Sequence, residues 1–257
     1  MKKHIQIAAL LILVGITAWH IKKLYNAKNE PNTTYLKVGT TADYPPFCYL
    51  QDHEIVGFDI DIVQEIAQRL GKTIDIVDMP FNVLLPGLQK KRFDIIAAGL
   101  TPDPRRNQVL FTQPYYQGDP LAIITLKPNN AQSVADLAGK VVVVNDGYLA
   151  DLYMSKQSGP TLKRLPSIAD ALLALKSKRA DAFVTAMSTM KPILEQQSPP
   201  EQGNAKFNIA QIPDAREEYS LAISKENPNL QEKIKKILEE MINDGTIKKL
   251  KTKWKLS

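Results

Sequence analysis

Apolar runs with the spacing of strands alternate with apolar runs with the spacing of helices along most of this chain. Residues 35–40 (YLKVGT) are predicted to form a strand. In the segment DIDIVQEIAQRLG that follows, the apolar residues share one helical face until Gly71 ends the pattern. Residues 73–79 (TIDIVDM) then have the pattern of a second strand. This βαβ order predicts an α/β protein whose sheets are mostly parallel and carry helices on their faces.

The alternation continues as far as residue 186. A short helix is expected in FNVLLPGLQKKR and a buried strand in FDIIAAGLT. The same order then runs from SVADLAG through KVVVVND, LADLYMSKQ and SIADALLALKSKR to ADAFVTA. The stretch FTQPYYQGDPLAIITLKPNN, rich in Pro and Gly, and the later stretch IPDAREEYSLAIS are interpreted as crossings between two α/β units. The last helix, residues 229–243, is expected to pack on the first unit.

Composition excludes several classes of site. The chain has 257 residues and a net charge of +6, with the excess of lysines at its two ends, a pattern typical of solvated helix faces rather than of a nucleic-acid partner. The single cysteine, Cys48, excludes an internal disulfide and a cysteine-based metal cluster. With three histidines, two of them in or beside the N-terminal apolar segment, we expect neither a metal nor another cofactor.

The N-terminus has the pattern of an export signal. Lys2 and Lys3 precede an apolar stretch over residues 5–21, and residues 26–34 (NAKNEPNTT) have the composition of a polar tether. The segment at residues 16–18 is a poor match to the small-residue cleavage pattern, and no cysteine follows that could carry a lipid. We therefore expect an uncleaved anchor rather than a cleaved signal, although about 17 residues is at the short limit for crossing a bilayer.

A polar and aromatic patch follows the first predicted strand. In open parallel sheets, ligands bind beyond the C-terminal ends of the strands, and two facing units would enclose such a ligand in a cleft. Tyr44 lies at this edge, followed by Pro46 and Phe47. We expect Tyr44 to contact a ligand and Phe47 to belong to the core.

Five segments, in this order, resemble the polar-amino-acid solute-binding proteins of ABC transporters, most closely the arginine/lysine/histidine-binding type. They are VGTTADYPPF, VGFDIDIVQEIAQRLGK, PFNVLLPGLQKKRFDIIAAGLT, RRNQVLFTQPYY and NDGTIKKLKTKW, and the resemblance covers about residues 35–256. It implies a two-lobed periplasmic binding protein fold of type II, with two crossover strands as a hinge. After the N-terminal segment 1–34, the first lobe would comprise residues 35–118 and 215–257, and the second lobe residues 119–214.

The resemblance also implies ligand-binding residues in the first lobe. Tyr44 and Phe81 match the two aromatic residues that sandwich the ligand's side chain, where a cationic group gains most from the ring faces. The strand-end positions that offer backbone and hydroxyl groups match Ala98, Gly99 and Thr101.

One arginine of the family pairs with the ligand carboxylate. It aligns with Arg106 when the positions are counted forward from Gly99, and with Arg105 when they are counted back from VLFT. Since the segment is one residue shorter than usual, both alternatives stay open, and Arg106 is preferred.

The second lobe would contribute a helix N-terminus to the site. Tyr148 and Leu149 follow the strand KVVVVN and open a helix, whose backbone N–H groups attract a carboxylate. The family usually has Ser or Thr at these positions. The backbone N–H groups can still donate to a ligand carboxylate with Tyr148 and Leu149 in place, but the hydrogen bond from a Ser or Thr hydroxyl is lost.

Two further positions depart from the family. Thr41 stands where an acidic residue commonly meets a polar ligand head, and Ala186 stands where an acidic residue holds the ligand's ammonium group. An unpaired buried ammonium would cost several kcal/mol. The ligand is therefore either not an ordinary α-amino acid, or another acid holds its ammonium group, and the candidates are Asp43, Asp146 and Asp119.

The resemblance favours a periplasmic, monomeric solute-binding subunit of an ABC importer. It would capture an amino acid of the basic or polar type, such as arginine, or a related small zwitterion, and pass it to a permease in the inner membrane. The alternative is an enzyme like cyclohexadienyl dehydratase, in which a cleft carboxylic acid moves protons. Ala186 removes the obvious position for that acid, so we expect no catalytic residue. A ligand-sensing module with a membrane partner is a third interpretation.

Overall fold

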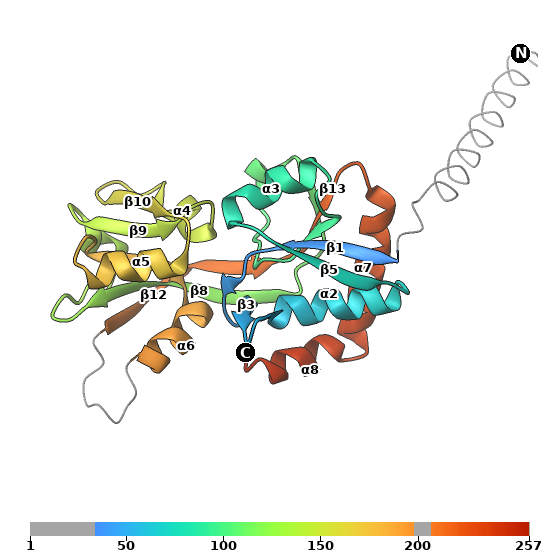
Figure 1. Ribbon diagram of the computed structural model, residues 1–257. Helices are drawn as coiled ribbons and strands as arrows, with labels where there is room; N and C mark the ends of the chain where they lie inside the picture. The colour runs from blue at the N-terminus through green and yellow to red at the C-terminus, as the bar shows by residue number, and fades with distance from the viewer. Residues whose placement is uncertain (1–33, 198–206, 257) are drawn as a thin grey trace, which may run out of the picture. The chain divides into compact units, whose positions relative to one another are not determined.

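The computed structural model describes residues 34–197 and 207–256, and residues 35–257 form one compact unit (Figure 1). The predicted anchor at residues 5–21 and residues 26–33 of the predicted tether lie outside the described residues. Within the two described ranges, no helix combines the length and the apolar character needed to cross a membrane.

The first sheet has the strand order β5-β1-β6-β13-β7. Its strands are β1 (Tyr35–Thr40), β5 (Thr73–Asp78), β6 (Ile95–Ile96), β7 (Val109–Phe111) and β13 (Ala222–Ser224). The helices that pack on it are α2 (Phe58–Arg69), α3 (Phe81–Gln89) and α7 (Pro228–Asn243), and α8 (Thr246–Lys253) packs on α2 and α7. The first lobe is thus assembled from an early and a late segment of the chain.

The second sheet has the order β10-β9-β11-β8-β12. Its strands are β8 (Tyr116–Leu126), β9 (Val141–Asn145), β10 (Thr161–Leu165), β11 (Ala182–Ala186) and β12 (Phe207–Tyr219). The α-helices packed on it are α4 (Leu149–Met154), α5 (Ile168–Lys176) and α6 (Met187–Gln197). The segment SVADLAG forms the short 3-10 helix η2 (Val134–Leu137).

Both sheets are mixed, whereas the sequence pattern predicted mostly parallel sheets. In each sheet two strand pairs are parallel and two are antiparallel. The antiparallel pairs involve β8 and β12, the strands that carry the chain from the first lobe to the second and back, and β13, which re-enters the first sheet after the return. Because one crossing strand runs out and the other returns, the two pair antiparallel, and Figure 1 shows them extending side by side between the lobes.

A small antiparallel sheet follows β1, and the alternation of strands and helices did not predict it. It consists of β2 (Asp43–Tyr44), β3 (Cys48–Gln51) and β4 (Glu54–Val56). Its turn is closed by the Phe47 amide, which donates to the Tyr44 carbonyl at 2.9 Å. The Phe47 side chain is fully buried, which confirms its assignment to the core.

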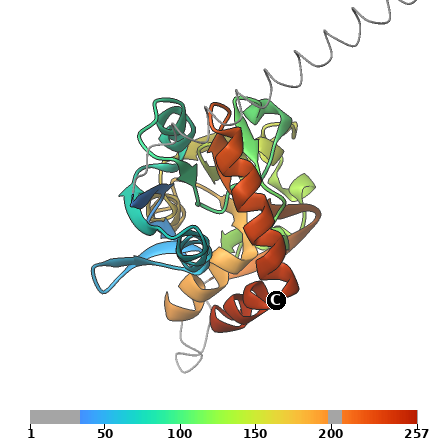
Figure 2. The same cartoon turned by 90° about the vertical axis from the view of Figure 1, so that its right-hand side faces the viewer.

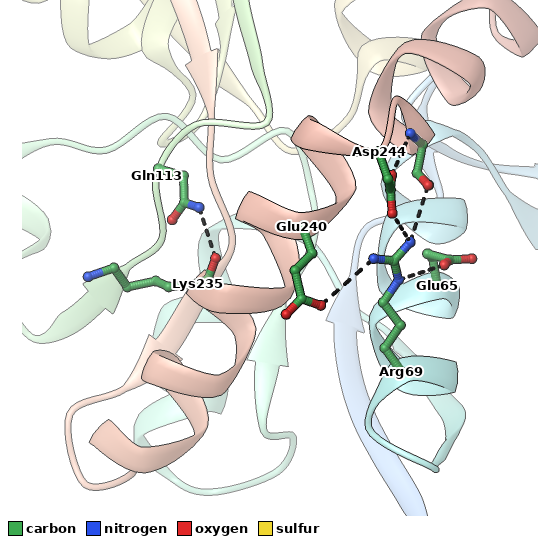
Figure 3. A network of polar contacts seen from close by, with 7 residues as sticks. Glu65, Arg69, Gln113, Lys235, Glu240 and Asp244 are labelled. Carbon is green, nitrogen blue, oxygen red and sulfur yellow. Dashed lines mark hydrogen bonds and ion pairs between the residues drawn. The ribbon is translucent and has the colours of Figure 1, made fainter.

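The last helices pack on the first lobe, as the sequence predicts. Figure 2 looks onto α7, which contacts α2, β7 and β13. Arg69 of α2 forms ion pairs within α2 and with the end of α7 (Figure 3). Its guanidinium contacts Glu65 at 2.8 Å, Asp244 at 2.8 Å and Glu240 at 4.0 Å. Nearby, the Gln113 side chain donates to the Lys235 carbonyl of α7 at 3.0 Å. The late segment is therefore bound to the first lobe by both apolar and polar contacts.

Gly57 is expected to be required for folding, because it joins the small sheet to α2 with φ 140° and ψ 174°, and an added Cβ would lie 2.0 Å from the Phe47 carbonyl oxygen. Gly71 is the matched control, since it has φ 68° but no heavy atom within 4 Å of such a Cβ. Chemical denaturation should show a loss of about 1 kcal/mol for Gly71→Ala and a distinctly larger loss for Gly57→Ala. Equal losses would contradict the close contact with Phe47.

Candidate functional site

Residues from both lobes and from the returning crossover strand meet around Thr101. The first lobe brings Tyr44, Phe81 and the loop after β6, and the second lobe brings the turn before α4. Glu217 of β12 accepts a hydrogen bond from the Thr101 hydroxyl at 3.0 Å. Elements far apart in the sequence thus converge on one buried region, which is the candidate ligand site.

Three aromatic rings pack together in this region. Phe81 and Tyr148 stack with ring centroids 3.8 Å apart and planes inclined by 25°, and the Tyr148 ring centroid lies 5.2 Å from that of Tyr44. All three side chains are buried. Because Tyr148 contacts both rings that the resemblance assigns to the sandwich, a side chain of the protein itself stands where the ligand's side chain is expected.

Tyr44 is fully buried, and its hydroxyl lies 2.9 Å from the hydroxyl of Tyr219. It is held close to Gly99, where an added Cβ would lie 2.6 Å from a carbon of the Tyr44 ring. In this closed arrangement Tyr44 therefore belongs to the core as well as to the candidate site. Its loss is expected to lower stability even without ligand.

The loop after β6 begins earlier than the pattern FDIIAAGLT predicts. The strand contains only Ile95 and Ile96, and the chain then turns at Gly99, which has φ 56°. The Gly99 amide donates to the buried Asp59 carboxylate at 2.6 Å, and Ala98 is fully buried. After this turn, the chain brings the Thr101 carbonyl within hydrogen-bond distance of Arg106.

The structure distinguishes the two candidate arginines. They lie in the 3-10 helix η1 (Pro104–Arg106), where Arg105 is exposed and forms an ion pair with Asp103 at 2.8 Å. Arg106 is buried, and its guanidinium donates to the carbonyl of Thr101 at 2.5 Å and to that of Gly147 at 2.6 Å. It therefore links the first lobe to the turn before α4.

Arg106 has no carboxylate within 4.0 Å among the described residues. Its burial lowers the pKa of the guanidinium, and the nearby Glu217 acts in the opposite direction. Arginine nonetheless stays protonated, so this buried positive charge has neutral carbonyl groups as its hydrogen-bond partners. Such a group is arranged to receive an anion.

Glu217 was not found by the sequence analysis. It is 1% exposed, and it lies directly across from Asp119 in the register between β12 and β8. Burial, and then the charge of Asp119, raise the pKa of Glu217 to about 8. One signal was available: in the burial alternation of β12, Glu217 has the same parity as Ala215 and Tyr219, both of which face inward.

Asp119 is the most fully hydrogen-bonded of the acids named as candidates. It accepts from the Ser188 amide at 3.0 Å, from the Ser188 hydroxyl and from the Tyr219 hydroxyl at 3.2 Å. Burial raises its pKa, and these hydrogen bonds lower it. Ala186 ends β11 nearby, with Leu121 of β8 as its register partner, and its methyl group is fully buried.

The remaining candidates lie at the margins of the region. Thr41 donates to Asp43 at 2.8 Å, and Asp43 is half-buried and lines a cavity of about 490 Å³ between the small sheet and α5. Asp146 accepts from Asn82 of α3 at 2.9 Å, a further link between the lobes. Leu149 packs instead on the core of the second lobe.

The free energy of unfolding of the ligand-free protein is expected to carry a pH dependence that originates at Glu217. The groups facing it are Asp119 from β8, Arg106 from η1, the Thr101 hydroxyl and the Tyr219 hydroxyl. Between about pH 5 and pH 8 the folded protein keeps a proton that the unfolded chain has lost, so this contribution to stability decreases as pH rises.

Urea unfolding of the wild type and of Glu217→Gln across this range measures the effect. The variant should gain stability relative to the wild type as pH increases. Parallel curves for the two proteins would show that Glu217 is already ionised in the folded state.

The chain matches the model of the bacterial extracellular solute-binding proteins, family 3, over residues 36–257. It is 33% identical over 235 residues to the arginine-binding extracellular protein ArtP of Bacillus subtilis, covering 89% of each chain. It is 34% identical over 234 residues to a probable histidine-binding protein of Campylobacter jejuni, covering 90% of this chain and 89% of that protein.

Solved structures show the same fold. An ancestral arginine-binding protein bound to arginine has 36% identity and a TM-score of 0.80, covering 86% of this chain and 98% of that one. The holo form of ArgBP from T. maritima has 35% identity and a TM-score of 0.75, covering 84% and 95%. These findings confirm the two-lobed fold and a binding protein rather than an enzyme. The chain belongs to the bacterial extracellular solute-binding proteins of family 3.

Proposed function

We propose that this protein captures an amino acid outside the cytoplasmic membrane and presents it to the permease of an ABC importer, with Arg106 receiving the ligand's carboxylate. The observation that carries the proposal is the buried guanidinium of Arg106, which has carbonyl partners but no carboxylate within 4.0 Å among the described residues. A bidentate pair with a carboxylate supplies the missing negative charge. Since Arg106 also contacts Gly147 of the second lobe, this pair forms where the lobes meet.

The ligand class follows from the same region and from the relatives. Proteins that share a third of their sequence with this chain bear the names of arginine- and histidine-binding proteins. We therefore propose a basic or polar amino acid, with arginine as the first ligand to test. Phe81 supports a cationic side chain, because it already has the Arg106 guanidinium 5.8 Å from its ring centroid.

Closure of the lobes would select the form that docks on the permease. Asn82 with Asp146 and Arg106 with Gly147 are contacts between the lobes that support this role. We place the lobe boundaries at residues 118/119 and 214/215. We further propose a monomer in the periplasm, tethered by residues 5–21. Intact-mass measurement of the native protein tests the tether, since a soluble chain beginning near residue 19 would refute it.

Substitution of the two neighbouring arginines tests the carboxylate site. Arg106→Ala should weaken binding of the best amino-acid ligand by about 2–5 kcal/mol, because a buried charge-assisted pair is lost. Arg105→Ala is the matched control and should bind normally, since its side chain is exposed and paired with Asp103.

Isothermal titration calorimetry with the twenty amino acids measures both variants. Normal binding by Arg106→Ala together with a loss in Arg105→Ala would transfer the role to Arg105. Normal binding by both variants would reject the carboxylate site.

Tyr148 is expected to limit the affinity for long side chains. A ligand whose side chain enters between Tyr44 and Phe81 must displace the Tyr148 ring, and such a stack is worth about 0.5–1.5 kcal/mol. Tyr148→Ser should therefore raise the affinity for arginine relative to glycine by up to about tenfold. Tyr148→Phe keeps the ring and should leave that ratio unchanged. If Tyr148→Ser lowers the ratio, the ring contributes to binding instead of competing with it.

A further inference from the structure

We propose that Glu217, with Asp119 beside it, receives the ammonium group of the ligand in place of the acid that is absent at Ala186. This inference rests on the proposed function, because it assigns the second pole of the same amino-acid site. It adds a residue from the returning crossover strand to a site otherwise built from the loops of the two lobes.

Among the described residues Glu217 is buried without an ion-pair partner, and the Arg106 guanidinium acts on it only from beyond 4.0 Å. The Glu217 side chain is 1% exposed, and the Thr101 hydroxyl is a neutral donor. In the described part of the chain, no Lys or Arg nitrogen lies within 4.0 Å of its carboxylate. Its register partner is another acid, Asp119. Two neighbouring buried carboxyl groups oppose folding unless a cation or a shared proton offsets them, so this pair is arranged to attract a cation.

Thr101 connects this negative pole to the positive one. Its carbonyl oxygen accepts from the Arg106 guanidinium at 2.5 Å, and its hydroxyl donates to Glu217 at 3.0 Å. Thr101 therefore contacts both Arg106, the proposed partner of the ligand's carboxylate, and Glu217, the proposed partner of its ammonium group. An α-amino acid carries its carboxylate and its ammonium on one carbon atom, so it needs a cationic and an anionic partner on neighbouring parts of one site. The pair of poles matches a zwitterion better than a simple anion or a simple cation.

Glu217 is better suited than Asp119 to bind the ammonium directly. The carboxylate of Asp119 already accepts three hydrogen bonds, two from Ser188 and one from Tyr219. Glu217 accepts one within the described residues, from the Thr101 hydroxyl, and the Tyr219 hydroxyl also faces it. Asp119 then acts as a second negative charge that Ser188 and Tyr219 hold in place. The other candidates, Asp43 and Asp146, are already engaged with Thr41 and Asn82 at the margins of the site.

The test compares each amino acid with the same molecule lacking its amine. The wild type, Glu217→Gln and Glu218→Gln are titrated by calorimetry with the twenty L-amino acids, and then with the des-amino carboxylic acid of the best ligand. Glu218 is the matched control, because it is the exposed neighbour of Glu217 on the same strand. Glu217→Gln keeps the size of the side chain and a hydrogen-bonding group at its end and removes only its ability to ionise.

We expect Glu217→Gln to weaken binding of the amino acid by about 10- to 150-fold, the range for a hydrogen bond to a charged group. Its affinity for the des-amino acid should be nearly unchanged, and Glu218→Gln should resemble the wild type. A second readout is proton release. Burial raises the pKa of Glu217 to about 8, so we expect this group to hold a proton at neutral pH in the ligand-free protein and an arriving ammonium group to expel it. Titrations at pH 7 in buffers of different ionisation enthalpy should detect the release in the wild type and not in Glu217→Gln.

Three results would overturn the inference. Wild-type affinity and wild-type proton release in Glu217→Gln would show that the ammonium binds elsewhere, while the proposed function stands. An equal loss of affinity for the amino acid and for its des-amino analogue would give Glu217 a purely structural role. If the folded wild type binds none of the twenty amino acids, the proposed function fails, and this inference fails with it.

Discussion

The antiparallel pairing of β8 with β12 is the interaction on which the rest of the molecule depends. These strands hold the two sheets in one unit, and their register sets Glu217 opposite Asp119. The same pair delivers Tyr219 to the first lobe, where its hydroxyl meets that of Tyr44 at 2.9 Å. A change in register would therefore alter both the connection between the lobes and the charge of the candidate site. The same ladder of backbone hydrogen bonds therefore connects the lobes and positions the two acids of the candidate site.

The buried charges at this junction are distributed unequally. Arg106 has carbonyl partners, Glu217 has a hydroxyl partner, and Asp119 has three donors. Leaving ionised groups in the interior without countercharges is costly, and it is tolerated where a ligand completes the set. The proposed roles of Arg106 toward the ligand's carboxylate and of Glu217 toward its ammonium group both rest on this cost of burying a charge without a countercharge.

Two departures from the family pattern have structural consequences in the same region. At Tyr148, where the resemblance implies Ser or Thr, a ring packs against Tyr44 and Phe81, the two residues proposed to enclose a ligand side chain. At Ala186, where the resemblance implies an acid, stands a buried methyl group, and we propose that Glu217 supplies the carboxylate from a different strand. A position-by-position comparison with the family detects the missing hydroxyl at Tyr148 and the missing acid at Ala186. It does not detect the ring contacts of Tyr148 or the nearby carboxyl group of Glu217. Such contacts join residues that are close in space but distant in the sequence, so the comparison of one aligned position does not contain them.

The sequence by itself determined the α/β class, the positions of β1, α2 and β5, the two crossings and the family. All of these depend on local periodicity and on short motifs that the chain carries in order. Only the tertiary structure decided that Arg106 turns inward while Arg105 pairs with Asp103, since neighbouring side chains of a 3-10 helix point about 120° apart and either could have faced the interior. It also decided that Glu217 meets Asp119 and Thr101. Those contacts join residues far apart in the chain, and strand register and lobe closure, which no local pattern encodes, bring them together.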